Sequence, residues 1–137
     1  MTFLHQLTPA VISLFCLVLS ALVFAGEPGG IYGDWAIRKI DDRLIPASID
    51  SHLSFSEDNR IGAKAGCNQL VAGFSLNNNK IDIKQAAATR KMCPEEAMEY
   101  EALLFKALES TASIRLKDET LTLMDEKDNA VLQAVRQ

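Results

Sequence analysis

Residues 66–94 read GCNQLVAGFSLNNNKIDIKQAAATRKMCP, and the pattern of predicted secondary structure changes within this stretch. It holds both cysteines that lie outside the hydrophobic N-terminal run, Cys67 near its start and Cys93 near its end. Between them, two alternating segments flank a run of three asparagines, which predicts a β-hairpin. A helical pattern begins directly after Cys93. The stretch therefore marks the change from strands to helix.

Apolar residues recur at helical spacing after Cys93 and predict one amphipathic helix from Pro94 to Ser110. Pro94 suits the first helical position, and the acidic residues that follow it suit the positive end of the helix dipole. The apolar face is predicted to consist of Ala97, Tyr100, Leu104, Ala107, Leu108 and Thr111, widened by Met98 and Phe105. The solvent face is predicted to carry Glu99, Glu101, Lys106 and Glu109.

Short alternating segments elsewhere predict β-strands. They cover residues 35–40, 52–56, 60–65, 70–76, 80–84, 113–117, 120–124 and 130–135. Residues 44–51 are ambiguous, because Pro46 favours an edge or a loop, and Gly73 indicates a bulge or a close backbone approach. With a single helix available for crossovers, antiparallel pairing is favoured. The predicted fold is α+β: a curled antiparallel sheet, resembling a small open barrel, with one helix packed against it.

The N-terminal run from Val11 to Ala25 is almost wholly apolar and ends in a small residue, as a Sec-type signal peptide does. We therefore expect a signal peptide over residues 1–25, a flexible lead-in over 26–33 and one domain over 34–137. Residues 1–10 carry no Lys or Arg, so an uncleaved anchor is the alternative. Cys16 lies inside the apolar run, where a lipid-attachment cysteine would not be found.

The chain has 14 basic and 18 acidic residues and a net charge of −4, with the two signs interspersed. This balance gives no electrostatic reason to bind nucleic acid. After cleavage at Ala25 two cysteines remain, and an even count in an exported protein predicts a disulfide between Cys67 and Cys93. Two buried free thiols are the alternative.

Catalytic and metal-binding patterns find little support. His52 is the one histidine after the leader and falls on a predicted strand, without a serine-hydrolase motif. Cys93 precedes a helix N-terminus, which could activate a thiolate, but Cys67 offers it a disulfide partner. Residues 125–129 are rich in oxygen ligands but lack the glycine and final glutamate of a calcium loop. We expect no enzyme activity, no metal and no cofactor.

Several residues together resemble the signature of the META domain, the HslJ-like heat-shock protein family. They are Gly66, Cys67, Asn68, Gly73, Thr89, Cys93, Pro94 and Glu99. The resemblance implies a compact α+β fold, export to the bacterial envelope, and links to heat shock and novobiocin tolerance, with no established catalysis. Gln69-Leu70-Val71 stands where relatives carry an aromatic residue or Arg, and the lipid-attachment cysteine of many relatives is absent. A periplasmic or secreted, non-lipidated form is therefore expected.

Structural roles account for the signature residues. Gly66 and Asn68 suit a tight turn with left-handed backbone, and Thr89 suits the capping of the helix. The function expected is that of a noncatalytic periplasmic monomer, without a membrane span after cleavage. It would act in envelope stress or antibiotic tolerance by binding a protein or lipid partner. The alternatives are an inhibitor-like module that offers the stapled segment 67–93 to an envelope enzyme, and a small hydrolase or metal-dependent enzyme.

Overall fold

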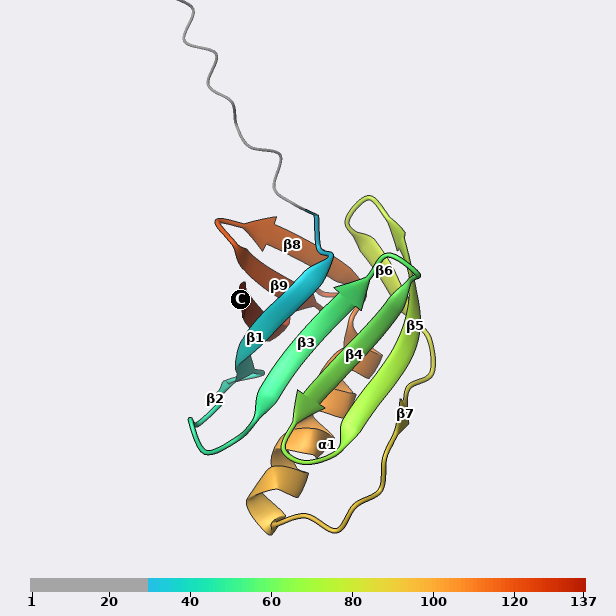
Figure 1. The fold of residues 1–137 in the computed structure, drawn as a ribbon. Helices are drawn as coiled ribbons and strands as arrows, with labels where there is room; N and C mark the ends of the chain where they lie inside the picture. The colour runs from blue at the N-terminus through green and yellow to red at the C-terminus, as the bar shows by residue number, and fades with distance from the viewer. Residues whose placement is uncertain (1–29) are drawn as a thin grey trace, which may run out of the picture.

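The computed structural model describes residues 30–137, which form a curled sheet with one helix behind it (Figure 1). The predicted signal peptide and the first part of the lead-in lie outside the described residues. The strands are β1 (Gly33–Ile40), β2 (Arg43–Leu44), β3 (Ser51–Ser56), β4 (Arg60–Ala65), β5 (Gln69–Asn77), β6 (Lys80–Ile83), β7 (Ala87–Ala88), β8 (Ser113–Lys117), β9 (Thr120–Met124) and β10 (Ala130–Arg136). The helix, α1, spans Glu95–Ser110.

The strands pair antiparallel in the order β10-β9-β8-β6-β5-β4-β3-β1-β2, and β7 pairs with β5. A further pairing of β10 with β1, from Trp35 opposite Arg136 to Ile40 opposite Leu132, closes the curled sheet into a barrel. The predicted α+β class, with antiparallel pairing and one packed helix, is confirmed.

The sheet has its shortest strand pairings on the side of β5 that faces away from β4. Strands β6 and β7 share the same side of β5, β6 along its second half and β7 along its first. Beyond β6 the ring continues to β8 through one residue pair, Lys80 opposite Ser113. Helix α1 lies across this end of the barrel, and the segment that carries β7 runs beside it (Figure 1). Strand β7 pairs only with β5, so the sheet does not continue beyond β7, and the candidate site lies there.

Side chains fill the barrel interior, as small barrels require. Trp35 is fully buried, and its indole Nε1 donates to the carbonyl of Ile31 at 2.8 Å. The other fully or almost fully buried large side chains are Ile40, Leu53, Phe55, Ile61, Leu70, Leu104, Leu108, Leu121, Leu123 and Leu132. Helix α1 closes the core with Ala97, Tyr100, Leu104, Ala107 and Leu108. No helix in the described part of the chain has the length and apolar character needed to span a membrane.

The local predictions differ from the structure at a few points. The helix begins at Glu95, and Pro94 is its N-cap rather than its first helical residue. Strand β7 was not predicted, because two alanines carry no alternating pattern. Strand β5 passes through Gly73 without a bulge, which was one of the two features expected there. The last part of the expected lead-in, residues 30–33, belongs to the fold, since Ile31 is buried and Gly33 opens β1.

Candidate functional site

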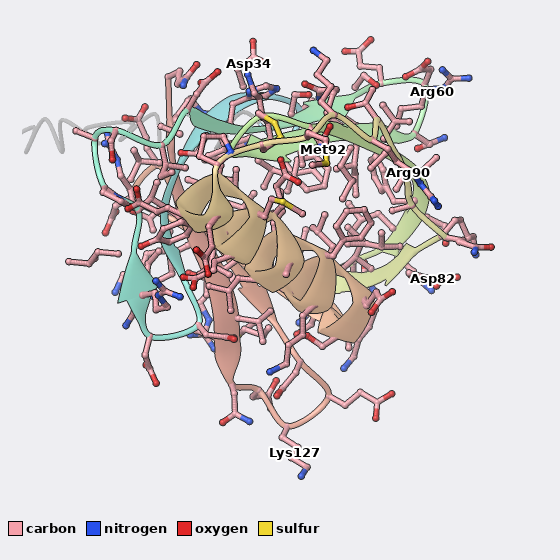
Figure 2. All side chains as sticks on the ribbon, turned by 90° about the horizontal axis from the view of Figure 1, so that it is seen from below. Asp34, Arg60, Asp82, Arg90, Met92 and Lys127 are labelled. Atoms are coloured by element: carbon pink, nitrogen blue, oxygen red, sulfur yellow. A yellow bond between two sulfur atoms is a disulfide. The ribbon has the colours of Figure 1, made fainter. Side chains whose placement is uncertain are left out.

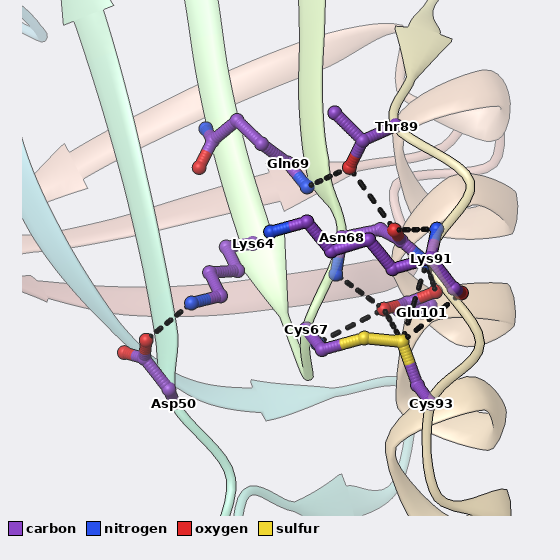
Figure 3. Close-up of a disulfide and its surroundings, with 9 residues drawn as sticks. All are labelled: Asp50, Lys64, Cys67, Asn68, Gln69, Thr89, Lys91, Cys93 and Glu101. Atoms are coloured by element: carbon purple, nitrogen blue, oxygen red, sulfur yellow. Dashed lines mark hydrogen bonds and ion pairs between the residues drawn. A yellow bond between two sulfur atoms is a disulfide. The ribbon is translucent and has the colours of Figure 1, made fainter.

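A disulfide joins Cys67 to Cys93, as predicted, with 6.2 Å between the two Cα atoms (Figure 3). Cys67 lies two residues before β5, and Cys93 lies two residues before α1. The bond therefore ties the first half of the barrel to the start of the helix. It also fixes one end of the segment 86–92, which runs between β6 and α1.

Glu101 is the polar centre of this region. Its Oε1 accepts the backbone N–H of Cys67 at 3.0 Å and that of Asn68 at 2.6 Å, and its Oε2 accepts Asn68 Nδ2 at 2.9 Å. Burial alone would raise the pKa of Glu101, but the side-chain and backbone hydrogen bonds from Asn68, with that from Cys67, lower it below its ordinary value. The predicted placement of Glu101 on the solvent face is wrong, because its carboxylate is turned toward the barrel.

Asn68 connects the helix to the segment after β7. Its Oδ1 accepts the backbone N–H of Lys91 at 2.7 Å and the hydroxyl of Thr89 at 3.0 Å, and its Nδ2 also donates to the carbonyl of Lys91 at 3.3 Å. Asn68 does not have the left-handed backbone that was predicted. Asn68 stabilises this region through its side-chain amide, whose nitrogen donates hydrogen bonds and whose oxygen accepts them.

Thr89 does not cap the helix. Its Oγ1 accepts the backbone N–H of Gln69 at 3.0 Å and donates to Asn68, so it fastens the β7 segment to β5. The N-cap of α1 makes no side-chain hydrogen bond, because Pro94 occupies that position. The predicted capping role of Thr89 is therefore wrong, and its proximity to the helix in the sequence was misleading.

Gly66 has the left-handed backbone expected of it, with φ of +127°. A Cβ atom added there would lie 2.7 Å from the carbonyl oxygen of Ala97, so the glycine also allows the turn to touch α1. Gly73 makes no comparably close approach, since an added Cβ would meet Lys84 at 3.7 Å. Glu99 does not take part in the Glu101–Asn68 hydrogen bonds and pairs with Arg43 at 3.4 Å, in a partly exposed contact.

A groove of about 680 Å³ lies between the segment 86–92 and α1. From the helix it is lined by Met98, Glu101 and Phe105, and from the segment by residues 86–92, with Asn68 beneath. Met92 is 98% exposed and Met98 49%. Figure 2 shows Met92 and Arg90 on the same side of the molecule, along the segment beside the helix. A groove that combines exposed methionines with a basic rim, formed by Arg90 and Lys91, is suited to binding.

Sequence pattern alone does not predict this groove, because it predicts different environments for the helix residues that line it. Helical periodicity predicts Met98 and Phe105 on the apolar face of the helix and Glu101 on the opposite face. The spacing of Met98, Glu101 and Phe105, three and four residues apart, is nevertheless that of one helical stripe. That spacing was the available signal.

The residues considered for catalysis or metal binding are placed elsewhere or are already bonded. His52 is half-buried on β3, opposite Lys64 of β4, and the Lys64 ammonium is paired with Asp50 at 2.6 Å. The Asp125 carboxylate accepts the backbone amides of Lys127 and Asn129 and the side-chain amide of Asn129, so it organises its own turn. The hydrogen bonds from Asn129 lower the pKa of Asp125.

One further group of potential ligands lies at the disulfide. The sulfur atoms of Cys67 and Cys93 and a carboxylate oxygen of Glu101 lie within 4.8 Å of one another. In the disulfide the sulfur atoms are not thiolates, which are the form that binds metals. The cluster therefore has a structural role in the oxidised protein.

The META domain family matches residues 31–137. The chain belongs to the META domain family. A search of curated proteins finds no match.

The fold of this chain is also found in solved structures of low sequence identity. A protein from Burkholderia xenovorans, solved by NMR, is 18% identical, with a TM-score of 0.61 over 76% of this chain and 81% of that one. A DUF4847 family protein from Bacteroides vulgatus is 12% identical, with a TM-score of 0.59 over 78% and 94%. At these identities the likeness concerns the fold.

Proposed function

We propose that this META domain protein is a noncatalytic protein of the bacterial envelope that binds a partner protein through the groove between residues 86–92 and α1. The observation that carries the proposal is Met92, whose side chain is 98% exposed on a segment held by a disulfide and by Asn68. A segment fixed in this way loses little conformational freedom on binding, which lowers the entropic cost of association. Met is also common on binding surfaces, because its flexible side chain adapts to the partner.

A protein is favoured over a lipid as the partner. A lipid chain needs a deep apolar cavity, whereas the interior of this barrel is filled by Trp35, Leu53, Leu121 and their neighbours. The groove itself has polar as well as apolar lining, because Asn68, Arg90, Lys91 and Glu101 contribute to it. Mixed apolar and polar lining is typical of protein interfaces.

Export to the periplasm, without lipidation, is part of the proposal. The apolar leader and a disulfide in the mature domain support it, because disulfides persist in oxidising compartments. A role in envelope stress or tolerance to novobiocin-type antibiotics rests on the family resemblance. If the partner is an enzyme, the same rigid segment would serve the inhibitor-like role.

Site-specific photocrosslinking in producing cells tests the proposal. A photoreactive amino acid is placed at Met92 and, as a matched control, at Leu44, which is 73% exposed outside the groove. We expect a discrete protein adduct from position 92 and none from position 44. An adduct with lipid alone would show that the partner is a lipid and not a protein. Equal or absent adducts at both positions would overturn the proposal. An adduct with an enzyme whose activity falls on binding would assign the inhibitor-like role.

A further inference from the structure

Strand β7 has one edge paired and one edge turned away from the sheet. Its pairing with β5 sets Ala88 opposite Leu70 and Ala87 opposite Val71. The amide of Thr89 donates to the carbonyl of Gln69 at 3.0 Å. Hydrogen-bonded pairs alternate along an antiparallel ladder, so Ala87 also faces β5, while the N–H and C=O groups of Ala88 point to the other side.

The hydrogen bonds of β5 to β4 and β6 lead to the same direction for the backbone groups of Ala88. The amide of Phe74 donates to Asn59 at 3.0 Å, so the even-numbered residues of β5 direct their backbone groups toward β4. The carbonyl of Gly73 accepts the amide of Lys84 at 2.8 Å on the β6 side. By the same alternation Val71 faces β7, and Leu70, opposite Ala88, does not. The outward groups of Ala88 therefore lie on an open strand edge that borders the groove.

The charges around this edge have a consistent sign. Arg90 and Lys91 are exposed and lie two and three residues after Ala88 along the groove. The carboxylate that lines the groove belongs to Glu101, which already accepts three hydrogen bonds. The rim is thus basic on a chain whose net charge is −4. A basic rim complements an acidic ligand.

We propose that the groove binds an extended acidic peptide segment, which pairs with the outward edge of Ala88 as an additional strand. Its apolar side chains lie against Met98 and Phe105, and its carboxylates lie near Arg90 and Lys91. Strand addition takes affinity from main-chain hydrogen bonds and specificity from the side chains on alternate positions. This inference rests on the proposed function and specifies the chemistry of the partner at that site.

Three synthetic peptides test the mode of binding. The first is a ten-residue capped peptide that alternates Val and Glu. The second replaces Glu with Lys. The third keeps the Val-Glu sequence but is N-methylated at alternate residues, which removes main-chain donors. We expect the first peptide alone to shift the amide resonances of residues 86–92 and 98–105 at millimolar concentration or below. Equal binding by the N-methylated peptide would overturn strand addition, and equal binding by the Lys peptide would overturn the charge preference.

Amide hydrogen exchange supplies a residue-level readout. The amide of Ala87 is already bonded to β5, whereas that of Ala88 is not. Binding should therefore slow exchange at Ala88 at least about tenfold, because a new hydrogen bond protects the amide, and change Ala87 less. Unchanged exchange at Ala88 in the presence of bound peptide would place the ligand elsewhere.

Charge reversal tests the rim. The double change R90E/K91E should weaken binding of the Val-Glu peptide by at least about tenfold. The control K127E reverses one charge at the far end of the helix from Met92 (Figure 2), half the charge change of the double variant, and should leave affinity unchanged. Equal losses in both variants would show a general charge effect and overturn the assignment. If no peptide binds while the crosslink at position 92 persists, the strand-addition inference fails and the proposed function stands. If both are absent, the proposed function fails as well.

Discussion

The Glu101 carboxylate and the Asn68 backbone amide are joined by a hydrogen bond of 2.6 Å across 33 positions of sequence. The same carboxylate also holds Asn68 Nδ2 and the amide of Cys67. The Cys67–Cys93 disulfide and this carboxylate therefore bind the same turn to the same helix, one covalently and one by hydrogen bonds. The duplication gives the groove wall two independent supports, and each can be removed separately.

The charge of Glu101 should contribute measurably to stability. Replacing Glu101 with Gln removes the charge and turns an amide NH₂ toward one of its three donors. We expect a loss of about 1–3 kcal/mol in the free energy of unfolding, because hydrogen bonds to a charged acceptor are lost and a part-buried donor is left without its acceptor. Urea denaturation of wild type and variant measures this difference in the free energy of unfolding. Glu99→Gln is the matched control on the same helix, and should cost less than about 1 kcal/mol since its ion pair with Arg43 is half-exposed. Equal losses for the two variants would contradict the role given to Glu101.

The lowered pKa of Glu101 also predicts a pH dependence. A carboxylate whose pKa is lower in the folded state adds stability above its unfolded value, near 4.5, and loses that contribution as the pH falls through the folded value. Wild-type stability should therefore decline below pH 4.5. Asp50, whose pKa is lowered by its hydrogen bond with Lys64, contributes to the same decline. The informative quantity is the difference between wild type and Glu101→Gln, which should narrow as the pH falls. A constant difference from pH 7 to pH 3 would argue against this linkage.

Removing the disulfide should destabilise the domain without unfolding it. In the chain-entropy model, closing a loop of this length is worth about 3.5 kcal/mol. The double variant C67S/C93S is expected to melt at a lower temperature and to retain its circular dichroism spectrum, because the Glu101 and Asn68 hydrogen bonds remain. Added reductant should lower the melting temperature of the wild type to that of the variant, and leave the variant itself unchanged. A wild type that is insensitive to reductant would show that the bond contributes little.

The sequence predicted those features that depend on local pattern. Alternation from Arg60 to Ala65 and helical spacing before Ser110 reproduced β4 and the end of α1, and Asn78 takes the left-handed turn that three asparagines indicated. The disulfide was predicted from the even count of cysteines after the expected signal peptide, and the structure contains it. Local pattern could not show which long-range partners a polar side chain would find.

Glu101 and Thr89 illustrate this limit. Helical periodicity and its charge predict Glu101 on the solvent face. Three N–H groups of Cys67 and Asn68 nevertheless need an acceptor, and the Glu101 carboxylate accepts all three. Thr89 was assigned to the nearest helix in the sequence, whereas it bonds a strand 20 residues earlier. The groove depends on these contacts, and for that reason could not be predicted from spacing alone.

Two glycines of the family signature should respond oppositely to the same substitution. Gly66→Ala forces a side chain onto a backbone with φ of +127° and places its Cβ 2.7 Å from the carbonyl oxygen of Ala97. We expect a loss of at least about 1–3 kcal/mol, because both the left-handed backbone and the contact with α1 are strained. Gly73→Ala lies in a regular part of β5, where the new Cβ would meet Lys84 at 3.7 Å. There the substitution should be neutral or should stabilise by up to about 1 kcal/mol, since alanine lowers the entropy of the unfolded chain. Thermal and urea unfolding of both variants compare them directly, and equal destabilisation would show that the close approach of Gly66 to the helix is not what selects glycine there.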